Sequence, residues 1–88
     1  MPNHFSAYPN PFKETLSLEV ELDSNVSTIV KIVNLEGKII KLLSWNIKQG
    51  INKTSLHDMR SLEPGDYFVE IKDMKGNNLF SAKLNKEQ

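Results

Sequence analysis

The sequence predicts an all-β protein, an antiparallel β-sandwich of about seven short strands. Three observations predict it: apolar and polar residues alternate over several runs, isolated glycines close the turns between those runs, and one segment has the form of a tyrosine corner. With 88 residues the chain has room for one small domain with one thin core. It contains no cysteine, which excludes a disulfide scaffold and thiolate zinc sites.

The clearest strand signal covers residues 15–23. Leucine and valine occupy alternate positions there, with serine and acidic residues between them, which is typical of a half-buried strand. In residues 26–34 apolar positions fall on both faces, with Ile29 and Val33 opposite Val30, so we expect a central strand that is covered on both sides or carries a local bulge. Further strands are expected before Pro9 and at residues 38–44, 48–56, 66–72 and 79–85.

Gly37 and Gly76 each end a short turn, where glycine permits the positive φ that closes a tight hairpin loop. The residues before them also correspond. Segment 30–37 reads Val-x-Ile-x-Asn-Leu-x-Gly, and segment 69–76 reads Val-x-Ile-x-Asp-Met-x-Gly. This indicates either a duplicated repeat or two hairpins that use the same turn, and in both cases the hairpins are antiparallel.

The segment 62–67 reads Leu-Glu-Pro-Gly-Asp-Tyr and has the form of a tyrosine corner. In such a corner the tyrosine hydroxyl reaches back to the backbone just upstream. Pro64 presets φ, Gly65 permits the bend, and Tyr67 fastens the arch between the sheets. The motif strengthens the prediction of a sandwich and gives Tyr67 a structural role.

Charge and hydropathy exclude several classes of function. Eleven Lys and Arg balance eleven Asp and Glu without a polybasic cluster, which is unlike a protein that binds nucleic acid or an anionic membrane. No apolar run approaches the roughly 20 residues of a membrane-spanning helix. The first residues lack the basic and apolar regions of a signal peptide.

Candidate catalytic and metal-binding groups are sparse. Glu19 and Glu21 share a strand face, but an open strand surface does not provide the closed pocket that acid–base catalysis requires. His57 lies in a polar loop, and His4 is too far away in the sequence to give metal-ligand spacing. We therefore expect no catalytic residues, no metal site, no cofactor and no enzymatic activity.

An alternative function rests on two aromatic residues. Trp45 follows the strand expected at 38–44, and an exposed indole stacks on sugar rings, for which Tyr8 offers a second platform. On this hypothesis the chain is an Ig- or fibronectin-like accessory module of an extracellular protein that binds carbohydrate. A tryptophan at such a position more often caps one end of a sandwich core, so the signal is weak.

A set of motifs in fixed order extends over most of the chain. Segment 8–12 reads Tyr-Pro-Asn-Pro-Phe, and its prolines suit a strand end or a sheet edge. It is followed by Gly-Lys at 37–38, Gly-x-Asn at 50–52, Gly-x-Tyr at 65–67 and lysines at 83 and 86. In this order the sequence resembles the C-terminal sorting domain of the type IX (Por) secretion system of Bacteroidetes. We expect residues 1–7 to be an N-terminal linker or cloning remnant and residues 8–88 to be the sorting domain.

The resemblance implies a compact Ig-like β-sandwich that acts as a non-catalytic signal at the end of a longer exported precursor. Its partners would be the type IX translocon, a sortase-like peptidase that removes the domain at the cell surface, and a covalently linked N-terminal cargo. The cargo would pass through the periplasm and finish at the cell surface or outside the cell. The oligomeric state is left open.

The same resemblance assigns roles in translocon recognition or motif integrity to Pro9, Asn10, Pro11, Gly37, Gly65, Tyr67, Lys83 and Lys86. The glycines and the tyrosine are expected to secure the fold. The two lysines lie near the end of the sequence, where packing does not explain them, so they are the better candidates for contact with the translocon. Removal of residues 83–88 is accordingly expected to abolish export and to leave the sandwich folded.

Overall fold

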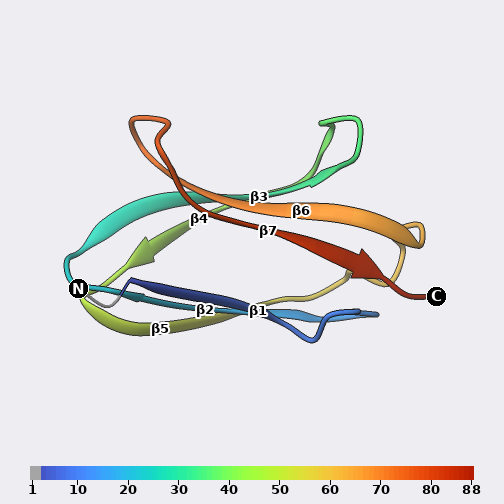
Figure 1. Ribbon diagram of the computed structural model, residues 1–88, viewed down its shortest axis with the longest axis horizontal. Coiled ribbons are helices and arrows are strands. Elements are labelled where there is room, and N and C mark those ends of the chain that lie inside the picture. Colours follow the sequence, from blue (N-terminus) through green and yellow to red (C-terminus); the bar gives the residue numbers. More distant parts are fainter. Residues whose placement is uncertain (1–2) are drawn as a thin grey trace.

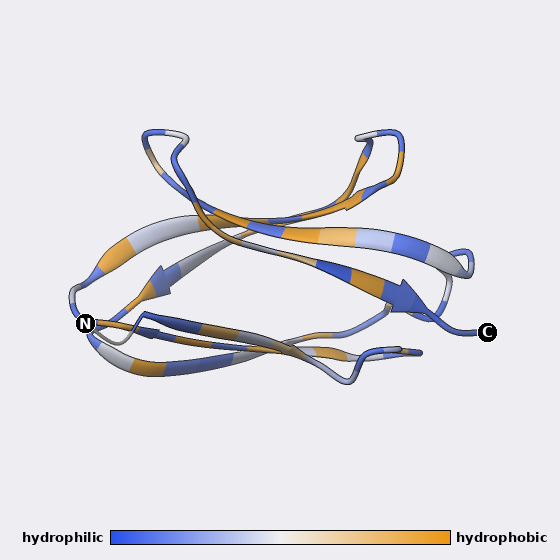
Figure 2. Cartoon of the chain, viewed as in Figure 1, coloured by the Kyte–Doolittle hydropathy of each residue, from blue (hydrophilic) through white to orange (hydrophobic). Residues whose placement is uncertain are grey.

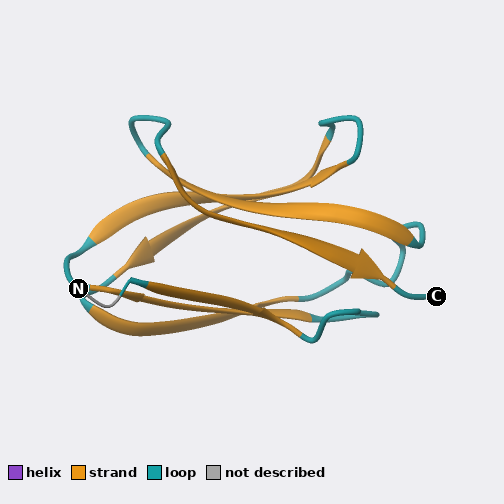
Figure 3. Cartoon of the chain, in the orientation of Figure 1, coloured by secondary structure: helices purple, strands orange, loops and turns teal. Residues whose placement is uncertain are grey.

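The computed structural model describes residues 3–88 as seven strands in two facing sheets (Figure 1). The strands are β1 (His4–Tyr8), β2 (Leu16–Leu22), β3 (Val26–Asn34), β4 (Ile39–Ile47), β5 (Gly50–Leu56), β6 (Gly65–Asp73) and β7 (Asn78–Lys86). All regular structure within residues 3–88 is strand, connected by turns and loops (Figure 3). Over this range there is no helix of the length and apolarity needed to cross a membrane.

Both sheets are antiparallel throughout. One has the strand order β1-β2-β5 and the other β4-β3-β6-β7. The predicted all-β sandwich is confirmed, and the arrangement is consistent with an Ig-like fold. β3 lies inside the larger sheet as expected, and its pairing with β4 shifts register between Ile32 and Val33, which confirms the bulge interpretation of its apolar pattern.

β1 contains residues that the sequence placed in a linker. It pairs with β2 along its whole length, from His4 opposite Glu21 to Tyr8 opposite Ser17. The ring of Phe5 also stacks on Phe80 of β7, with the ring centroids 5.4 Å apart. Residues 4–7 therefore belong to the folded domain, and the domain boundary predicted at residue 8 lies too late in the chain. The first two residues of that predicted linker lie outside the described residues.

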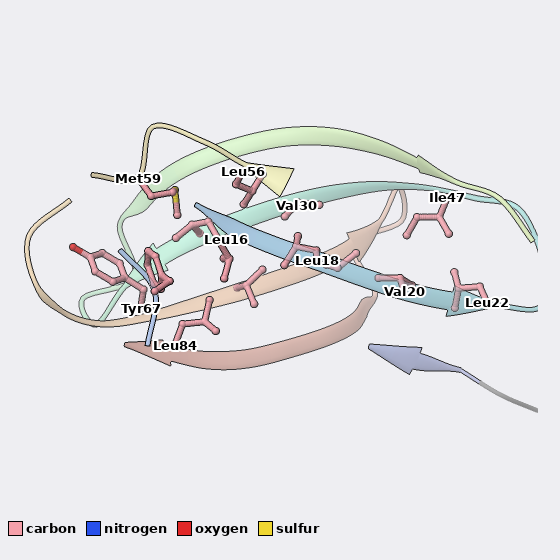
Figure 4. Packing of buried hydrophobic residues seen from close by; sticks show 14 residues of the cluster. Leu16, Leu18, Val20, Leu22, Val30, Ile47, Leu56, Met59, Tyr67 and Leu84 are labelled. Atoms are coloured by element: carbon pink, nitrogen blue, oxygen red, sulfur yellow. The ribbon is translucent and has the colours of Figure 1, made fainter. Parts of the chain in front are cut away.

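The core lies between the sheets and is formed by alternate residues of the strands. Hydrophobic and hydrophilic residues accordingly alternate along several strands in Figure 2. The fully buried members of the core include Leu16, Leu18, Val20, Val30, Ile32, Val69 and Ile71. Each such side chain contributes about 1.5–3 kcal/mol relative to exposure. Figure 4 shows Leu22 and Ile47 at one end of this core and Met59 and Tyr67 at the other, so the core extends along the length of the sandwich.

The larger sheet consists of two hairpins with the same layout, 39 residues apart in the sequence. A shift of 39 residues carries the bounds of β3 and β4 onto those of β6 and β7. The bulge between Ile32 and Val33 recurs between Ile71 and Lys72. The hairpins meet where β3 pairs with β6, so they are related by a local two-fold arrangement.

The turns of the two hairpins are held by the same kind of contact. The Oδ1 atom of Asn34 accepts hydrogen bonds from the backbone N–H groups two and four residues later, at 3.0 and 2.9 Å. Asp73 accepts the corresponding pair at 2.9 Å each. Gly37 and Gly76 have φ values of 83° and 88°, as the predicted turns require. Both turns curl away from the smaller sheet (Figure 1).

Candidate recognition site at the joined ends of the domain

Phe12, which precedes β2, pairs with the end of the last strand. Its N–H donates to the carbonyl of Asn85 at 2.9 Å, its carbonyl accepts from the N–H of Glu87 at 2.8 Å, and the pairing is a parallel bridge to Lys86. β7 is the outer strand of its sheet. The bridge therefore covers the end of an edge that would otherwise be open.

The side chain of Asn10 extends this contact along the same edge. Its Oδ1 accepts from the N–H of Asn85 at 3.0 Å, and its Nδ2 donates to the carbonyl of Lys83 at 3.4 Å. The carboxamide thus offers β7 one acceptor and one donor, as the backbone of a pairing strand would. Pro9 and Pro11 flank Asn10 and have no N–H, so the segment ends the pairing and does not continue it. The peptide bonds that precede both prolines are cis.

Beneath this edge the Phe12 ring is fully buried and packs edge-on against Tyr67, with the ring centroids 6.4 Å apart. The Tyr67 hydroxyl donates to the carbonyl of Glu63 at 2.7 Å, which confirms the predicted tyrosine corner. Burial, with a smaller contribution from the Glu63 charge, raises the pKa of Tyr67 above its ordinary value of 10.0. Tyr67 therefore packs against the Phe12 segment from the core side.

Gly65 starts β6 directly opposite Lys86. Its φ of 141° is a conformation that residues with a side chain rarely adopt. The glycine therefore permits the chain to leave the tyrosine corner and enter β6 at the position where β6 pairs with the last residue of β7.

Three polar side chains lie on the outer face beside this contact. The Nδ2 of Asn85 donates to Oδ1 of Asp66 at 3.1 Å, and the Nζ of Lys83 lies 3.6 Å from Oδ2 of the same carboxylate. The Lys83 side chain is 62% exposed, so this ion pair adds little to stability. The carboxylate orients an ammonium group that stays accessible to a partner.

Lys86 differs from Lys83 because it is only 4% exposed. Its Nζ donates to the carbonyl of Glu87 at 2.6 Å while its stem is packed into the end of the sandwich. The expectation that packing does not explain the terminal lysines is therefore wrong for Lys86. The sequence did not reveal this because the segment that covers it, at Phe12, lies at the other end of the chain.

The remaining predicted residues lie away from this cluster. Gly37 closes the turn between β3 and β4. Tyr8 ends β1 at the edge of the smaller sheet, whereas Trp45 lies within β4 at the edge of the larger sheet, half-buried against the core. The structure thus does not bring Tyr8 and Trp45 together as one stacking surface.

Phe12, Asp66 and Asn85 contribute to the site but were absent from the predicted residues. Phe12 had a usable signal in the sequence, because it is a large apolar residue that follows two prolines and precedes a charged pair. Asp66 and Asn85 had no such signal, because strand register determines which residues they contact. No group of three or more His, Asp or Glu residues within the described part of the chain lies in an arrangement that would hold a metal ion.

The comparison with protein families decides the identity. Residues 6–86 match the family described as "Secretion system C-terminal sorting domain", which is nearly the whole chain. The chain belongs to this family. The sorting domain is therefore a C-terminal signal for type IX secretion, and domains of this family are in general non-catalytic. Its membership also implies interaction with the secretion machinery and export toward the cell surface or the extracellular space.

Other comparisons bear on the fold. No curated protein matches the sorting domain. Among solved structures it resembles part of a beta-glucosidase from Kluyveromyces marxianus, with a TM-score of 0.60 and 13% identity over 98% of the sorting domain. The sorting domain spans only 15% of that chain. At this identity the likeness supports the sandwich fold and nothing about activity.

Proposed function

We propose that the type IX translocon recognises the joined ends of the domain as one folded unit, here called the terminal site. The terminal site comprises Pro9, Asn10, Pro11, Phe12, Asp66, Lys83, Asn85 and Lys86. The observation that carries the proposal is the pair of hydrogen bonds by which the Asn10 carboxamide donates to the carbonyl of Lys83 and accepts from the N–H of Asn85. A detached C-terminal peptide would lack these partners, so the translocon would read a folded domain and not a linear tail.

The surface of the terminal site suits a protein partner. Pro9 and Pro11 are exposed and rigid, and beside them lies an open groove of about 460 Å³ that also contacts Lys13 and Glu14. The accessible ammonium of Lys83 stands on the same edge strand. An apolar centre with a charged rim is the usual composition of a protein–protein interface.

In this proposal the domain directs a covalently linked cargo from the periplasm across the outer membrane. A sortase-like peptidase then removes the domain, and the cargo stays at the cell surface or enters the medium. The role requires no cofactor, since it depends on binding alone.

The direct test is a fluorescent reporter carrying a periplasmic signal peptide and followed by residues 1–88, expressed in a type IX-competent bacterium. We expect signal at the surface and in the medium that disappears when the translocon is deleted. A folded domain that stays in the periplasm despite an intact translocon would contradict the proposal. Deletion of residues 83–88 is not an informative variant, because it removes the buried Leu84 and the strand that holds Phe12.

Point substitutions separate recognition from folding. Lys83→Ala removes an exposed ammonium and is expected to lower export at least about fivefold with little change in stability. Lys75→Ala, on the exposed turn between β6 and β7, is the matched control and is expected to export normally. Equal export by both variants would remove Lys83 from the proposed contact.

Asn10→Ala tests whether the joined ends are required. We expect export to fall at least about fivefold and stability to fall by about 1 kcal/mol, because two hydrogen bonds to β7 are lost. Lys86→Met keeps the buried stem and removes only the charge. Normal export of this folded variant would assign Lys86 to packing alone.

A further inference from the structure

The opposite side of the sandwich has two unpaired strand edges. β4 is the outer strand of the larger sheet and β5 the outer strand of the smaller one, and residues 48–49 connect them. Among the strands that residues 3–88 form, none pairs with the outer side of β4 or β5. Figure 1 shows β4 descending toward β5 at this connection. β7 differs, because Phe12 covers the end of its edge.

Between these two edges lies an open cleft of about 420 Å³. It is lined by Lys41, Leu42, Leu43, Ser55, Leu56 and His57. Leu42 is 58% exposed and Leu43 is half-buried, so apolar surface remains accessible beside the free backbone groups of β4. We call the outer edge of β4 together with this cleft the open edge.

The open edge carries an excess of positive charge. The segment from Gly37 to His57 contains four lysines and no carboxylate, so it bears a charge of +4 and the rest of this neutral chain bears the compensating −4. Within residues 3–88, Lys38, Lys41 and Lys48 form no ion pair. The fourth, Lys53, lies 3.7 Å from Glu19 with its side chain 67% exposed, which is a weak contact.

We propose that the open edge binds an extended, acidic segment of a partner protein, which pairs with β4 as an additional strand. The unpaired N–H and C=O groups of β4 supply the main-chain hydrogen bonds of such a contact. Leu42 lies on the outer face of β4, whereas Lys41 and Leu43 lie on the face toward the cleft, because successive residues of a strand point to opposite faces. Apolar side chains of the added strand would lie beside Leu42 on the outer face. Carboxylates on the other face would meet Lys41, and acidic groups at the ends of the strand would meet Lys38 and Lys48, which gives charge complementarity.

Other occupants use fewer of these features. An anionic lipid surface would meet the lysines but would leave the backbone edge of β4 unused. A second copy paired along β4 would bring Lys41 and the flanking Lys38 and Lys48 of both copies together, and like charges close to one another are destabilising. The combination of a free edge, a cleft with leucine side chains and unpaired lysines therefore favours an acidic strand. The open edge is separate from the terminal site, so the inference does not depend on export.

The test is titration of the ¹⁵N-labelled domain with a capped peptide of nine residues, the length of β4, in which Val and Glu alternate. At about 50 mM salt, where charges are weakly screened, we expect amide shift changes concentrated in β4. The Val–Glu peptide should bind at least about tenfold more tightly than a Val–Lys peptide of the same length. Methylation of alternate backbone nitrogens should abolish binding if the peptide pairs as a strand.

Variants of the domain complete the test. Lys41→Glu should weaken binding of the Val–Glu peptide at least about fivefold, whereas Lys75→Glu, the same charge change on the turn between β6 and β7, should leave it unchanged. The spectrum of each variant reports whether it is folded. Shift changes at β7 in place of β4, equal binding of both peptides, no binding of either, or binding only to phosphatidylglycerol vesicles would each overturn the proposal.

Discussion

The hairpins β3–β4 and β6–β7 share their length, their bulge and the geometry of their turns, but their outer strands meet different surroundings. β7 receives Phe12 and the Asn10 carboxamide along its edge, and it forms part of the terminal site. β4, its counterpart, has no such cover within residues 3–88, and Lys41 within it and Lys38 and Lys48 beside its ends form no ion pair in that range. One folding solution is therefore used twice, and the two copies differ in what contacts their outer strand.

The largest difference in stability is expected between the edge of β7, which Phe12 covers, and the uncovered edge of β4. Phe12→Ala removes a fully buried ring that packs on Tyr67, and should lower the free energy of unfolding by about 3–5 kcal/mol. Leu42→Ala, on the uncovered β4, should change it by less than about 0.5 kcal/mol because the side chain is 58% exposed. Chemical denaturation measures the free energy of unfolding of both variants. Similar losses of stability would show that the contact of Phe12 with β7 does not distinguish the two edges.

A smaller effect is expected at Thr28 and Tyr67, which occupy equivalent positions in the two hairpins. Each hydroxyl donates to a carbonyl at 2.7 Å, Thr28 to Trp45 and Tyr67 to Glu63. Thr28→Val and Tyr67→Phe should each lower the free energy of unfolding by about 1 kcal/mol. If one variant lost several times more stability than the other, the two hydroxyl contacts would not be equivalent.

Tyr67 adds a dependence on pH that Thr28 lacks. Because its pKa is raised in the folded state, the stability that the neutral hydroxyl provides is complete below the unfolded value of about 10 and is lost as the pH rises through the folded value. Denaturation series at alkaline pH should therefore show a decline for the wild type that is smaller in Tyr67→Phe. The same decline in both proteins would assign it to other groups.

The smallest effect is expected at the turns, which differ in one titratable group. The backbone N–H of Asn77 is the main cause that holds the pKa of Asp73 below its usual value of 3.8. The turn at Asp73 should therefore keep its full stability above about pH 3.8 and lose it as the pH falls through the lower, folded value. Asn34, at the equivalent position, does not titrate.

Amide hydrogen exchange at Lys75 and Asn77 during acidification checks this difference. Asp73→Asn should remove the change with pH, and Asn34→Asp should introduce it at the turn between β3 and β4. If Asp73→Asn left the acid response of its turn unaltered, the carboxylate would not be its cause.

Much of the fold was predictable because its determinants are local. Hydropathy patterns and strand spacing located six strands within a few residues, and the glycines at 37 and 76 located both turns. Tyr67 was predicted correctly as well, since its partner at Glu63 lies only four residues away. The first strand was placed in part in a linker because the pattern in residues 4–8 is short.

The terminal site was only partly predictable, because its contacts join residues far apart in the sequence. Asn10 and Lys83 are separated by 73 residues, and no local pattern reports that the side chain of one would meet the backbone of the other. The burial of Lys86 was missed for the same reason. The motif order indicated candidate residues, whereas strand register determined how they meet.

The two prolines beside Asn10 have a consequence for self-association of the domain. Exposed strand edges promote pairing between copies at high local concentration. The segment that covers β7 offers no N–H at Pro9 or Pro11, so a neighbouring chain cannot extend the sheet there. Lys41 on β4, with Lys38 and Lys48 beside its ends, disfavours pairing with a second copy at that edge. Self-association through the edges of β7 and β4 is thus expected to be weak.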